Sequence, residues 1–293
     1  MYPISYQNNI SFKGHCGHEL IKYGREKMLL TTETAFGREF DTLACAVKYI
    51  NQKFPQIKEK KFVIGACSSG EEVWSYKMLM EDNPVKIIGF DMAKKALKQA
   101  KESIYTIFPQ NSKKIPLFCN DSDGYKDTFL AYEKESLTDN EKQLYRMFHK
   151  MFKQTKLKNF IFNRTDRKTY KLRNAQHDCK FMEADIKNLP ADITKEKYQL
   201  FSFRNAFYHI LTYHNGITRE ERTTKELKPI LNNIFKTINK TLDLGGIFVM
   251  GEKEEYQCDN IKLVTTTLID NGFALLKNDK NLNNIWTKVK EIQ

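Results

Sequence analysis

The sequence lacks long apolar runs. Among its 293 residues, of which 41% are hydrophobic, no stretch approaches the roughly 18 apolar residues that a membrane-spanning helix requires. Its first thirty residues also contain no compact apolar segment of the kind that a secretory signal peptide needs. These absences argue against an integral membrane protein, and we expect no membrane insertion and a cytoplasmic location for a chain that can build a substantial core.

Paired cysteines are a second absence. The six cysteines are scattered and form no CxxC pair, which is typical of reduced thiols in a cytosolic protein. One His-Cys-Gly-His stretch at 15–18 has no second cluster of metal-ligating residues to complete it. Because a structural zinc site usually takes its four ligands from two such clusters, we predict no metal site.

Glycine-rich phosphate loops are a third absence, since the chain holds neither GxGxxG nor GxxxxGK[ST]. In their place stands GACSSGEE at 65–72, a run of small residues between a strand-like stretch and a helix-like stretch. Small residues let a ligand approach the backbone, whereas the carboxylates of Glu71 and Glu72 would repel a pyrophosphate and tolerate a cation. The alternative is that both acids only favour the start of a helix.

Strand-like and helix-like segments alternate along most of the chain. Apolar strands are predicted at 61–66, 85–91, 197–203 and 246–252, and a final antiparallel pair is predicted from FALLKN and NIWTKV. The alternation indicates an α/β fold with an open, mostly parallel sheet that helices cover on both faces. In such sheets, ligands bind beyond the carboxyl ends of the strands.

The stretch 108–180 breaks this alternation, so we predict a basic insert there. The domain organisation that we predict is an N-terminal segment at 1–30 and one domain at 31–293 that carries the insert. Residues 141–180 hold twelve lysines and arginines against three acids, a net charge of +9 out of the +12 of the whole chain. This excess suits an acidic partner, either nucleic acid or an acidic protein, although a lysine-rich solvated face would look the same. Aromatic residues between the charges would suit stacking on bases: Tyr145, Phe148, Phe152, Phe160, Phe162 and Tyr170.

Asp91 ends the second predicted strand, 21 residues after Gly70. A small-residue loop after the first strand and an acid at the tip of the second form a nucleoside-binding layout, in which the acid accepts the ribose hydroxyls. Asp91 is also placed to cap the next helix, and the two roles are compatible. S-adenosylmethionine fits this layout, because it has a ribose, a positive charge and no phosphate.

Five stretches share a further pattern, in one order along the chain: TTETAFGRE at 31–39, ACSSGEEVWSYKM at 66–78, GFDMAKKALKQAKESIYTI at 89–107, FSFRNAFYHIL at 201–211 and LGGIFVMGEKEEY at 244–256. Together they resemble the CheR-type chemotaxis methyltransferases, which transfer a methyl group from S-adenosylmethionine to receptor glutamates. The resemblance implies the Rossmann-like class I methyltransferase fold, with a seven-stranded sheet and an antiparallel C-terminal strand. It also implies a protein-glutamate O-methyltransferase that acts on an acidic, chemoreceptor-like protein and releases S-adenosylhomocysteine.

The resemblance extends to single residues. Glu71 would hold the methionyl ammonium, Asp91 would hold the ribose, and Asn205 would contact the cofactor near its sulfonium. Asp185 and Ile186 would flank the adenine. The full set expected to contact the cofactor is Thr32, Thr34, Ala35, Arg38, Gly65, Ala66, Glu71, Asp91, Met92, Asp185, Ile186, Asn205 and Ala206.

Arg38, Tyr208 and His209 are the predicted catalytic residues. A carboxylate acceptor is already ionised at pH 7, so catalysis would come from in-line placement and the exclusion of water, without a general base. Arg38 would orient that carboxylate through its forked donors. An amine, hydroxyl or base nitrogen would instead need a proton acceptor, and Tyr208 and His209 are the candidates beside Asn205.

The sequence departs from the family pattern at positions that concern the acceptor. Gly37 stands where the family has a second phenylalanine, His209 stands where it has a tyrosine, and GEKE follows the last parallel strand. Two other functions therefore stay open. One is a methyltransferase that acts on RNA or another acidic substrate through the basic 141–180 stretch, and the other is a non-catalytic S-adenosylmethionine-binding signalling module.

Overall fold

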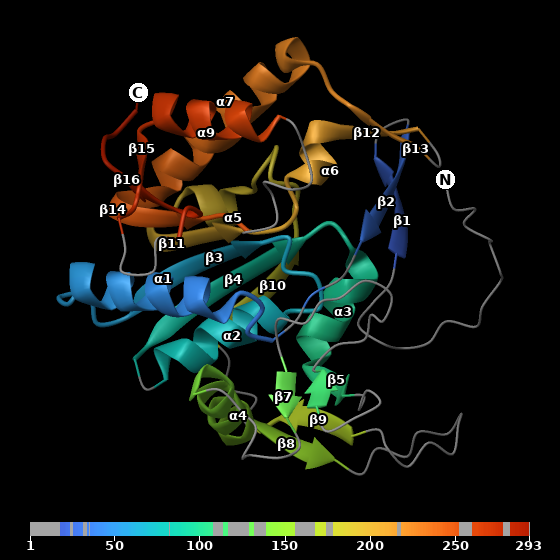
Figure 1. Cartoon of the computed structure of the whole chain (residues 1–293), viewed down its shortest axis with the longest axis vertical. Helices are drawn as coiled ribbons and strands as arrows, with labels where there is room; N and C mark the ends of the chain where they lie inside the picture. Colours follow the sequence, from blue (N-terminus) through green and yellow to red (C-terminus); the bar gives the residue numbers. More distant parts are fainter. Residues whose placement is uncertain are drawn as a thin grey trace.

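The architecture is a central sheet with helices on both faces and a smaller sheet below it (Figure 1). The computed structural model describes residues 18–23, 26–31, 34, 36–81, 83–107, 114–116, 129–131, 139–155, 168–173, 178–215, 218–251, 260–277 and 282–292. Within these ranges, no helix combines the length and the apolar character needed to cross a membrane.

Seven strands form the central sheet. Across the sheet they are β10 (Cys179–Glu183), β4 (Val85–Asp91), β3 (Lys60–Gly65), β11 (Tyr198–Phe203), β14 (Leu242–Val249), β16 (Ile285–Lys288) and β15 (Phe273–Leu275). The first five run parallel, and β16 is antiparallel to both of its neighbours. The chain enters at β3, moves outward to β10, and then returns to the other side of β3 with β11. The switch point of the sheet therefore lies between β3 and β11.

Helices cover both faces of this sheet. One face carries α1 (Phe40–Lys53), α2 (Glu71–Met80) and α3 (Lys94–Glu102), and the other carries α5 (Ala191–Thr194), α7 (Thr224–Thr241) and α9 (Ile261–Asp270) (Figure 1). Each face has its own apolar core, which is why every residue of β11, sandwiched between them, is buried. Full burial of one large apolar side chain is worth about 1.5–3 kcal/mol, so the two cores dominate the stability of the sheet.

The predicted fold class is confirmed: the chain has the Rossmann-like methyltransferase fold, with a mostly parallel seven-stranded sheet. The predicted strands correspond to β3, β4, β11 and β14, and the predicted final antiparallel pair is β15 and β16. β14 begins at Leu242, four residues before the predicted start. β10 was not predicted, because its residues Cys179–Glu183 mix charged and apolar side chains beside the basic stretch.

A smaller antiparallel sheet packs beneath the central one. It consists of β5 (Ile104–Ile107), β9 (Lys168–Leu172) and β8 (Phe152–Thr155), with α4 (Asp139–Met151) beside it. Its apolar face shares one cluster with α2 and with Phe36. Most of these elements fall in the predicted insert, whose limits stay a prediction, as do those of the N-terminal segment.

The aromatic residues of the basic stretch have a different role from the predicted one. Phe148, Phe152 and Tyr170 are buried in the cluster of the smaller sheet, where their rings contact one another. The interpretation that these three stack on bases is therefore wrong, because their rings face inward. The side chain of Tyr145, and Phe160 and Phe162 altogether, lie outside the described residues.

Three hairpins complete the described chain: β1 (His18–Tyr23) with β2 (Glu26–Thr31), β6 (Lys114–Pro116) with β7 (Phe129–Ala131), and β12 (Thr212–Asn215) with β13 (Thr218–Glu221). A short helix, α6 (Tyr208–Leu211), leads from the central sheet into the last hairpin. β2 and β12 are in contact, so the first and last hairpins lie side by side (Figure 1).

Burial gives the fold a testable dependence on alkaline pH. Desolvation by burial raises the pKa of the Cys179 thiol from its usual 9.0 to about 12. The charge of Lys77 opposes this rise in pKa, and the charge of Asp178 adds to it. Between these values the unfolded chain loses the proton and the folded protein keeps it, so the free energy of unfolding falls as the pH rises through this window. We expect Cys179→Ala to reduce that slope by up to about 1.4 kcal/mol per pH unit in urea unfolding from pH 8 to pH 11. An unchanged slope would contradict the assignment.

Candidate functional site

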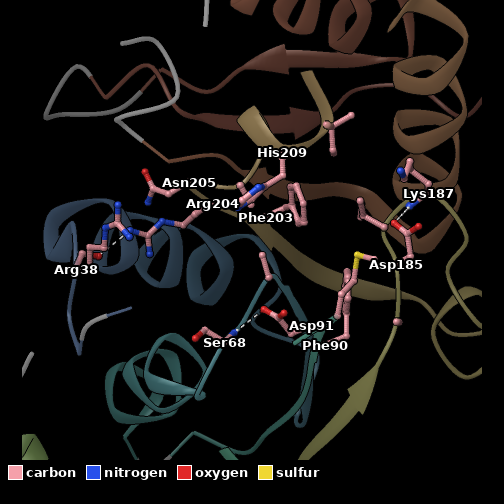
Figure 2. Close-up of a pocket in the computed structure, with 16 residues that line it drawn as sticks. Arg38, Ser68, Phe90, Asp91, Asp185, Lys187, Phe203, Arg204, Asn205 and His209 are labelled. Atoms are coloured by element: carbon pink, nitrogen blue, oxygen red, sulfur yellow. Dashed lines mark hydrogen bonds between the residues drawn. The ribbon is translucent and has the colours of Figure 1, made fainter. Parts of the chain in front are cut away.

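One cavity opens at the carboxyl ends of β4, β3 and β11, beside the switch point of the sheet (Figure 2). It encloses about 770 Å³ of empty space, part of it open to solvent, which is in the range of small-molecule sites. The side chains that line it are Arg38, Ala66, Ser68, Phe90, Asp91, Met92, Ala184, Asp185, Ile186, Lys187, Phe203, Arg204, Asn205, Ala206, His209 and Ile210.

The loop after β3 forms one wall of the cavity. Ala66 and Ser68 both adopt the left-handed conformation, with φ of 51° and 48°, which is uncommon for residues with a side chain. The loop keeps this shape because the Cys67 amide donates to the Phe90 carbonyl and the Ser68 amide donates to Asp91. Burial raises the pKa of the Cys67 thiol, with the nearby carboxylates adding to the effect, so this thiol stays neutral within the wall.

The carboxylate of Asp91 bonds to the loop after β3 and to the turn before α3. Its Oδ2 accepts a hydrogen bond from the Ser68 amide and its Oδ1 accepts one from the Ala93 amide, both at 2.8 Å. The prediction that Asp91 caps the helix is wrong, because α3 begins at Lys94 with Ala93 as its N-cap and no side-chain capping bond; the bond from the Ala93 amide instead closes a turn just before the helix. Each carboxylate oxygen can accept a further hydrogen bond, so the same group can also face a ligand in the cavity.

Glu71 lies beneath the loop and is not among the residues that line the cavity. Its side chain is 0% exposed, and both of its carboxylate oxygens accept hydrogen bonds from the Ser69 hydroxyl at 3.0 and 2.7 Å. The Ser69 carbonyl in turn accepts a hydrogen bond from the buried Tyr105 hydroxyl. The role of Glu71 with a ligand ammonium therefore stays a prediction.

The turn after β10 forms the opposite wall. The Oδ1 atom of Asp185 accepts a hydrogen bond from the Lys187 amide at 3.0 Å, which closes a tight turn (Figure 2). The turn brings Ala184, Asp185, Ile186 and Lys187 to the cavity together. The carboxylate of Asp185 can accept a hydrogen bond from an amino group, and the aliphatic side chain of Ile186 can cover the flat face of a ring.

Arg204, just after β11, is a buried charge in the lining of the cavity, with a side chain only 1% exposed. Its Nη2 lies 2.9 Å from the Glu39 carboxylate and donates to the Arg38 carbonyl at 2.7 Å, while its Nη1 lies 3.3 Å from Glu72. Burial opposes the charge of Arg204, but the carboxylates of Glu39 and Glu72 outweigh it and hold the pKa above its usual value. The guanidinium therefore stays charged and joins three segments of the chain.

Asn205 follows in a left-handed conformation, with φ of 53°. Its Nδ2 donates to Glu39 at 3.0 Å. Asn205 also explains the glycine at position 251, two residues after β14. A Cβ on Gly251 would lie 2.5 Å from Asn205 Oδ1 and 2.7 Å from the Asn205 backbone nitrogen. Glycine at 251 is needed for this close approach.

The three predicted catalytic residues have different positions. Arg38 and His209 line the cavity, whereas Tyr208 is not among the lining residues and is buried, its ring centroid 3.9 Å from that of His209. Gly37 adopts φ of 63°, a left-handed conformation that favours glycine.

The structure brings most of the residues predicted to contact the cofactor to one cavity: Arg38, Ala66, Asp91, Met92, Asp185, Ile186, Asn205 and Ala206. Thr34, Gly65 and Glu71 are described but are not among the lining residues, and Thr32 and Ala35 lie outside the described part of the chain. The cavity also includes residues that were not in the predicted contact set: Ser68, Phe90, Ala184, Lys187, Phe203, Arg204 and Ile210. Most of them adjoin a predicted residue in the sequence, which was the available signal.

The prediction of no metal site concerns the whole chain, whereas the structure describes only part of it. Among the described residues, no three His, Cys, Asp or Glu side chains gather in a way that would hold a metal ion. Residues 15–17 of the His-Cys-Gly-His stretch lie outside the described ranges.

The chain is similar to known proteins in structure alone. No protein-family profile and no curated protein matches the sequence. A candidate S-adenosyl-L-methionine-dependent methyltransferase from Methanococcus maripaludis has a TM-score of 0.41 and 10% identity, over 87% of each chain. TrmN from Thermus thermophilus has a TM-score of 0.37 and 11% identity, over 91% of this chain and 57% of its own.

The aminopentose methyltransferase CalS10 from Micromonospora echinaspora, solved with bound SAM, has a TM-score of 0.33 and 10% identity. That match covers 72% of this chain and 49% of CalS10. Because these TM-scores all lie below 0.5, the fold assignment rests on the order and direction of the strands themselves.

The ion pairs of Arg204 with Glu39 and Glu72 predict that substitution of Arg204 lowers the free energy of unfolding strongly. Arg204→Met would leave two carboxylates buried without their counter-ion, so we expect the free energy of unfolding to fall by about 3–5 kcal/mol in urea unfolding. Arg146→Met, on the exposed face of α4, is the matched control and should change it by less than about 0.5 kcal/mol. A loss below about 1 kcal/mol for Arg204→Met would show that the pairs contribute little.

Proposed function

We propose that the protein is an S-adenosylmethionine-dependent methyltransferase. The observation that carries the proposal is the cavity at the carboxyl edge of the sheet, where Asp91 at the tip of β4 and Asp185 after β10 flank the small-residue loop that follows β3. Ligands of open parallel sheets bind at this edge. An acid at the tip of the second strand is the group that accepts two ribose hydroxyls in nucleoside sites.

The lining suits a positively charged adenosine better than a phosphate. Asp91 and Asp185 offer acceptors to hydroxyl and amino groups, and Ile186, Phe203 and Ala206 offer apolar surface to a purine. Acids rather than glycines and a lysine open α2, which disfavours a phosphate at the usual position before the helix. When bound, the cofactor supplies a methyl group activated by its sulfonium.

The acceptor that we propose is a carboxylate, a protein glutamate, as in the CheR-type methyltransferases that five stretches of the sequence resemble. Arg38 supports this choice, because its guanidinium lines the cavity beside Asn205 and can hold a carboxylate with two donors. A carboxylate oxygen would bond to the methyl carbon while the carbon–sulfur bond breaks and its electron pair stays on sulfur. The products are a methyl ester and neutral S-adenosylhomocysteine, and no proton needs to move.

An acceptor that carries a proton would make a different demand on the site. An amine, a hydroxyl or a protonated ring nitrogen would need a group to take its proton, and His209 is the lining residue with that chemistry. Arg38 would then have no role in orientation. The carboxylate proposal therefore predicts that transfer depends on Arg38 more than on His209.

The partner that we propose is an acidic segment of a protein. Lys142, Arg146 and Lys150 are exposed along one face of α4 at a spacing of four residues. Like charges at this spacing destabilise an isolated helix by about 0.2–0.5 kcal/mol per pair, and a negative surface would relieve that repulsion. RNA is the second candidate, and the burial of Phe148, Phe152 and Tyr170 removes the rings that would have supported it.

Cofactor binding is the first test. We expect the protein to bind S-adenosylmethionine in isothermal titration calorimetry, and we expect Asp91→Ala to weaken binding at least thirtyfold because the ribose hydroxyls lose their acceptor. Glu102→Ala, at the exposed end of the neighbouring helix α3, should leave the affinity unchanged. Thermal unfolding of Asp91→Ala separates a lost contact from a collapsed loop. Wild-type protein that binds neither the cofactor nor its product would refute the proposal.

Methyl labelling tests the acceptor. The protein is mixed with methyl-labelled S-adenosylmethionine and a lysate of its host, and the protein and nucleic-acid fractions are treated separately with mild alkali. We expect label on protein that alkali releases, because a methyl ester hydrolyses readily, and we expect Arg38→Ala to abolish it. Alkali-stable methylated bases in RNA would instead favour the nucleic-acid function. Cofactor binding without any transfer would favour a non-catalytic binding module.

A further inference from the structure

Glu39 is an unusual residue at the edge of the cavity. It precedes the first turn of α1 in a left-handed conformation, with φ of 55° and ψ of 52°, and its side chain makes no capping hydrogen bond to the helix. The residue is only 7% exposed and is not among those that line the cavity. A non-glycine residue held in this conformation costs of order 1–3 kcal/mol, so its surroundings must hold it there.

The carboxylate of Glu39 faces three residues that line the cavity. Its Oε2 lies 2.9 Å from Arg204 Nη2, its Oε1 accepts from Asn205 Nδ2 at 3.0 Å, and the same Oε1 lies 3.9 Å from Arg38 Nε. Arg204 also donates to the carbonyl of Arg38, the residue before Glu39. One side chain outside the cavity therefore touches two cations and an amide that form its wall.

The chemistry of a carboxylate fixes the orientation of these groups. An ionised carboxylate only accepts hydrogen bonds, so Asn205 must turn its NH2 group toward Glu39 and its oxygen away. The same carboxylate neutralises Arg204, which lies between Arg38 and the sheet. Without this charge, Arg204 would keep its pair with Glu72 at 3.3 Å and lose the closer pair with Glu39 at 2.9 Å.

We propose that Glu39 is a positioning residue of the cavity: its carboxylate holds the NH2 group of Asn205 and so sets the orientation of the amide that a cationic cofactor meets. The inference rests on the proposed function and deepens it. It adds a residue that touches neither ligand and acts through Asn205. With its NH2 group held by Glu39, the amide of Asn205 offers its oxygen to a ligand, which favours a sulfonium over a neutral thioether, and hence the cofactor over its product.

The test compares the affinities of two ligands that differ in charge. S-adenosylmethionine carries a sulfonium and S-adenosylhomocysteine a neutral sulfur, so their affinity ratio reports the charge around that atom. Glu39→Gln keeps the size of the side chain and removes its charge. We expect calorimetry to show that this variant binds S-adenosylmethionine about tenfold more weakly and S-adenosylhomocysteine less than threefold more weakly.

Glu72→Gln is the matched control. Glu72 is the other carboxylate on Arg204, but its remaining hydrogen bond is with the Ser202 hydroxyl rather than with Asn205. Removing its charge takes the same amount of negative charge from Arg204 and leaves the Asn205 amide in place. We expect the affinity ratio of Glu72→Gln to stay within twofold of the wild-type ratio.

Two outcomes would overturn the inference while leaving the proposed function intact. One is an equal loss of both affinities in Glu39→Gln, which would mean a structural role alone. The other is an equal change of the ratio in both variants, which would assign the effect to the charge on Arg204 and not to Asn205. Wild-type protein that binds neither ligand would instead overturn the proposed function.

A variant that folds only in part can still be tested. A ligand that binds only the folded state raises the unfolding temperature by an amount that depends on its concentration and affinity. Unfolding temperatures of Glu39→Gln at matched concentrations of the two ligands therefore give the same comparison as calorimetry. A ratio of ligand effects equal to that of wild type would overturn the inference here as well.

Discussion

The buried guanidinium of Arg204 is the constraint on which the cavity depends. Burying one charge without partners is costly, and here the carboxylates of Glu39 and Glu72 both offset that cost. Glu39 precedes α1, Glu72 lies in α2 and Arg204 follows β11, so each pair forms only when the end of β11 meets one of the two other segments. The pairs thus make the assembly of the cavity wall dependent on the assembly of the central sheet, and they give the wall its shape before any ligand arrives.

The segment from Phe36 to Glu39 shows how closely the wall is held. Phe36 is fully buried in the cluster of the smaller sheet, and the Gly37 amide donates to the Ser75 hydroxyl at 2.7 Å. The Arg38 carbonyl accepts a hydrogen bond from Arg204, and the Glu39 carboxylate forms an ion pair with the same guanidinium. The four residues are therefore fixed by three parts of the fold: the aromatic cluster, α2 and Arg204. This is why the backbone can keep two left-handed residues, at 37 and 39, where a free loop would relax.

The sequence predicted well the features that depend on local pattern. The strands β3 and β4, the loop between β3 and α2, and Asp91 all follow from apolar runs, small residues and an acid at a strand end. Arg204 was missed as a structural centre because its contacts with residues 38 and 39 span about 166 positions, which no local pattern records. The stacking role for Phe148 and Phe152 was wrong because charge on neighbouring residues does not say which face of an element turns inward.

The same cluster of rings connects the smaller sheet to the cavity. Phe36 makes edge-on contacts with Phe148 of α4 at 5.2 Å and with Phe152 of β8 at 5.5 Å. The opposite face of α4 carries the exposed basic stripe, and Phe36 is two residues from Arg38 in the chain. One layer of aromatic side chains therefore separates the exposed basic face of α4 from the segment that carries the arginine of the cavity.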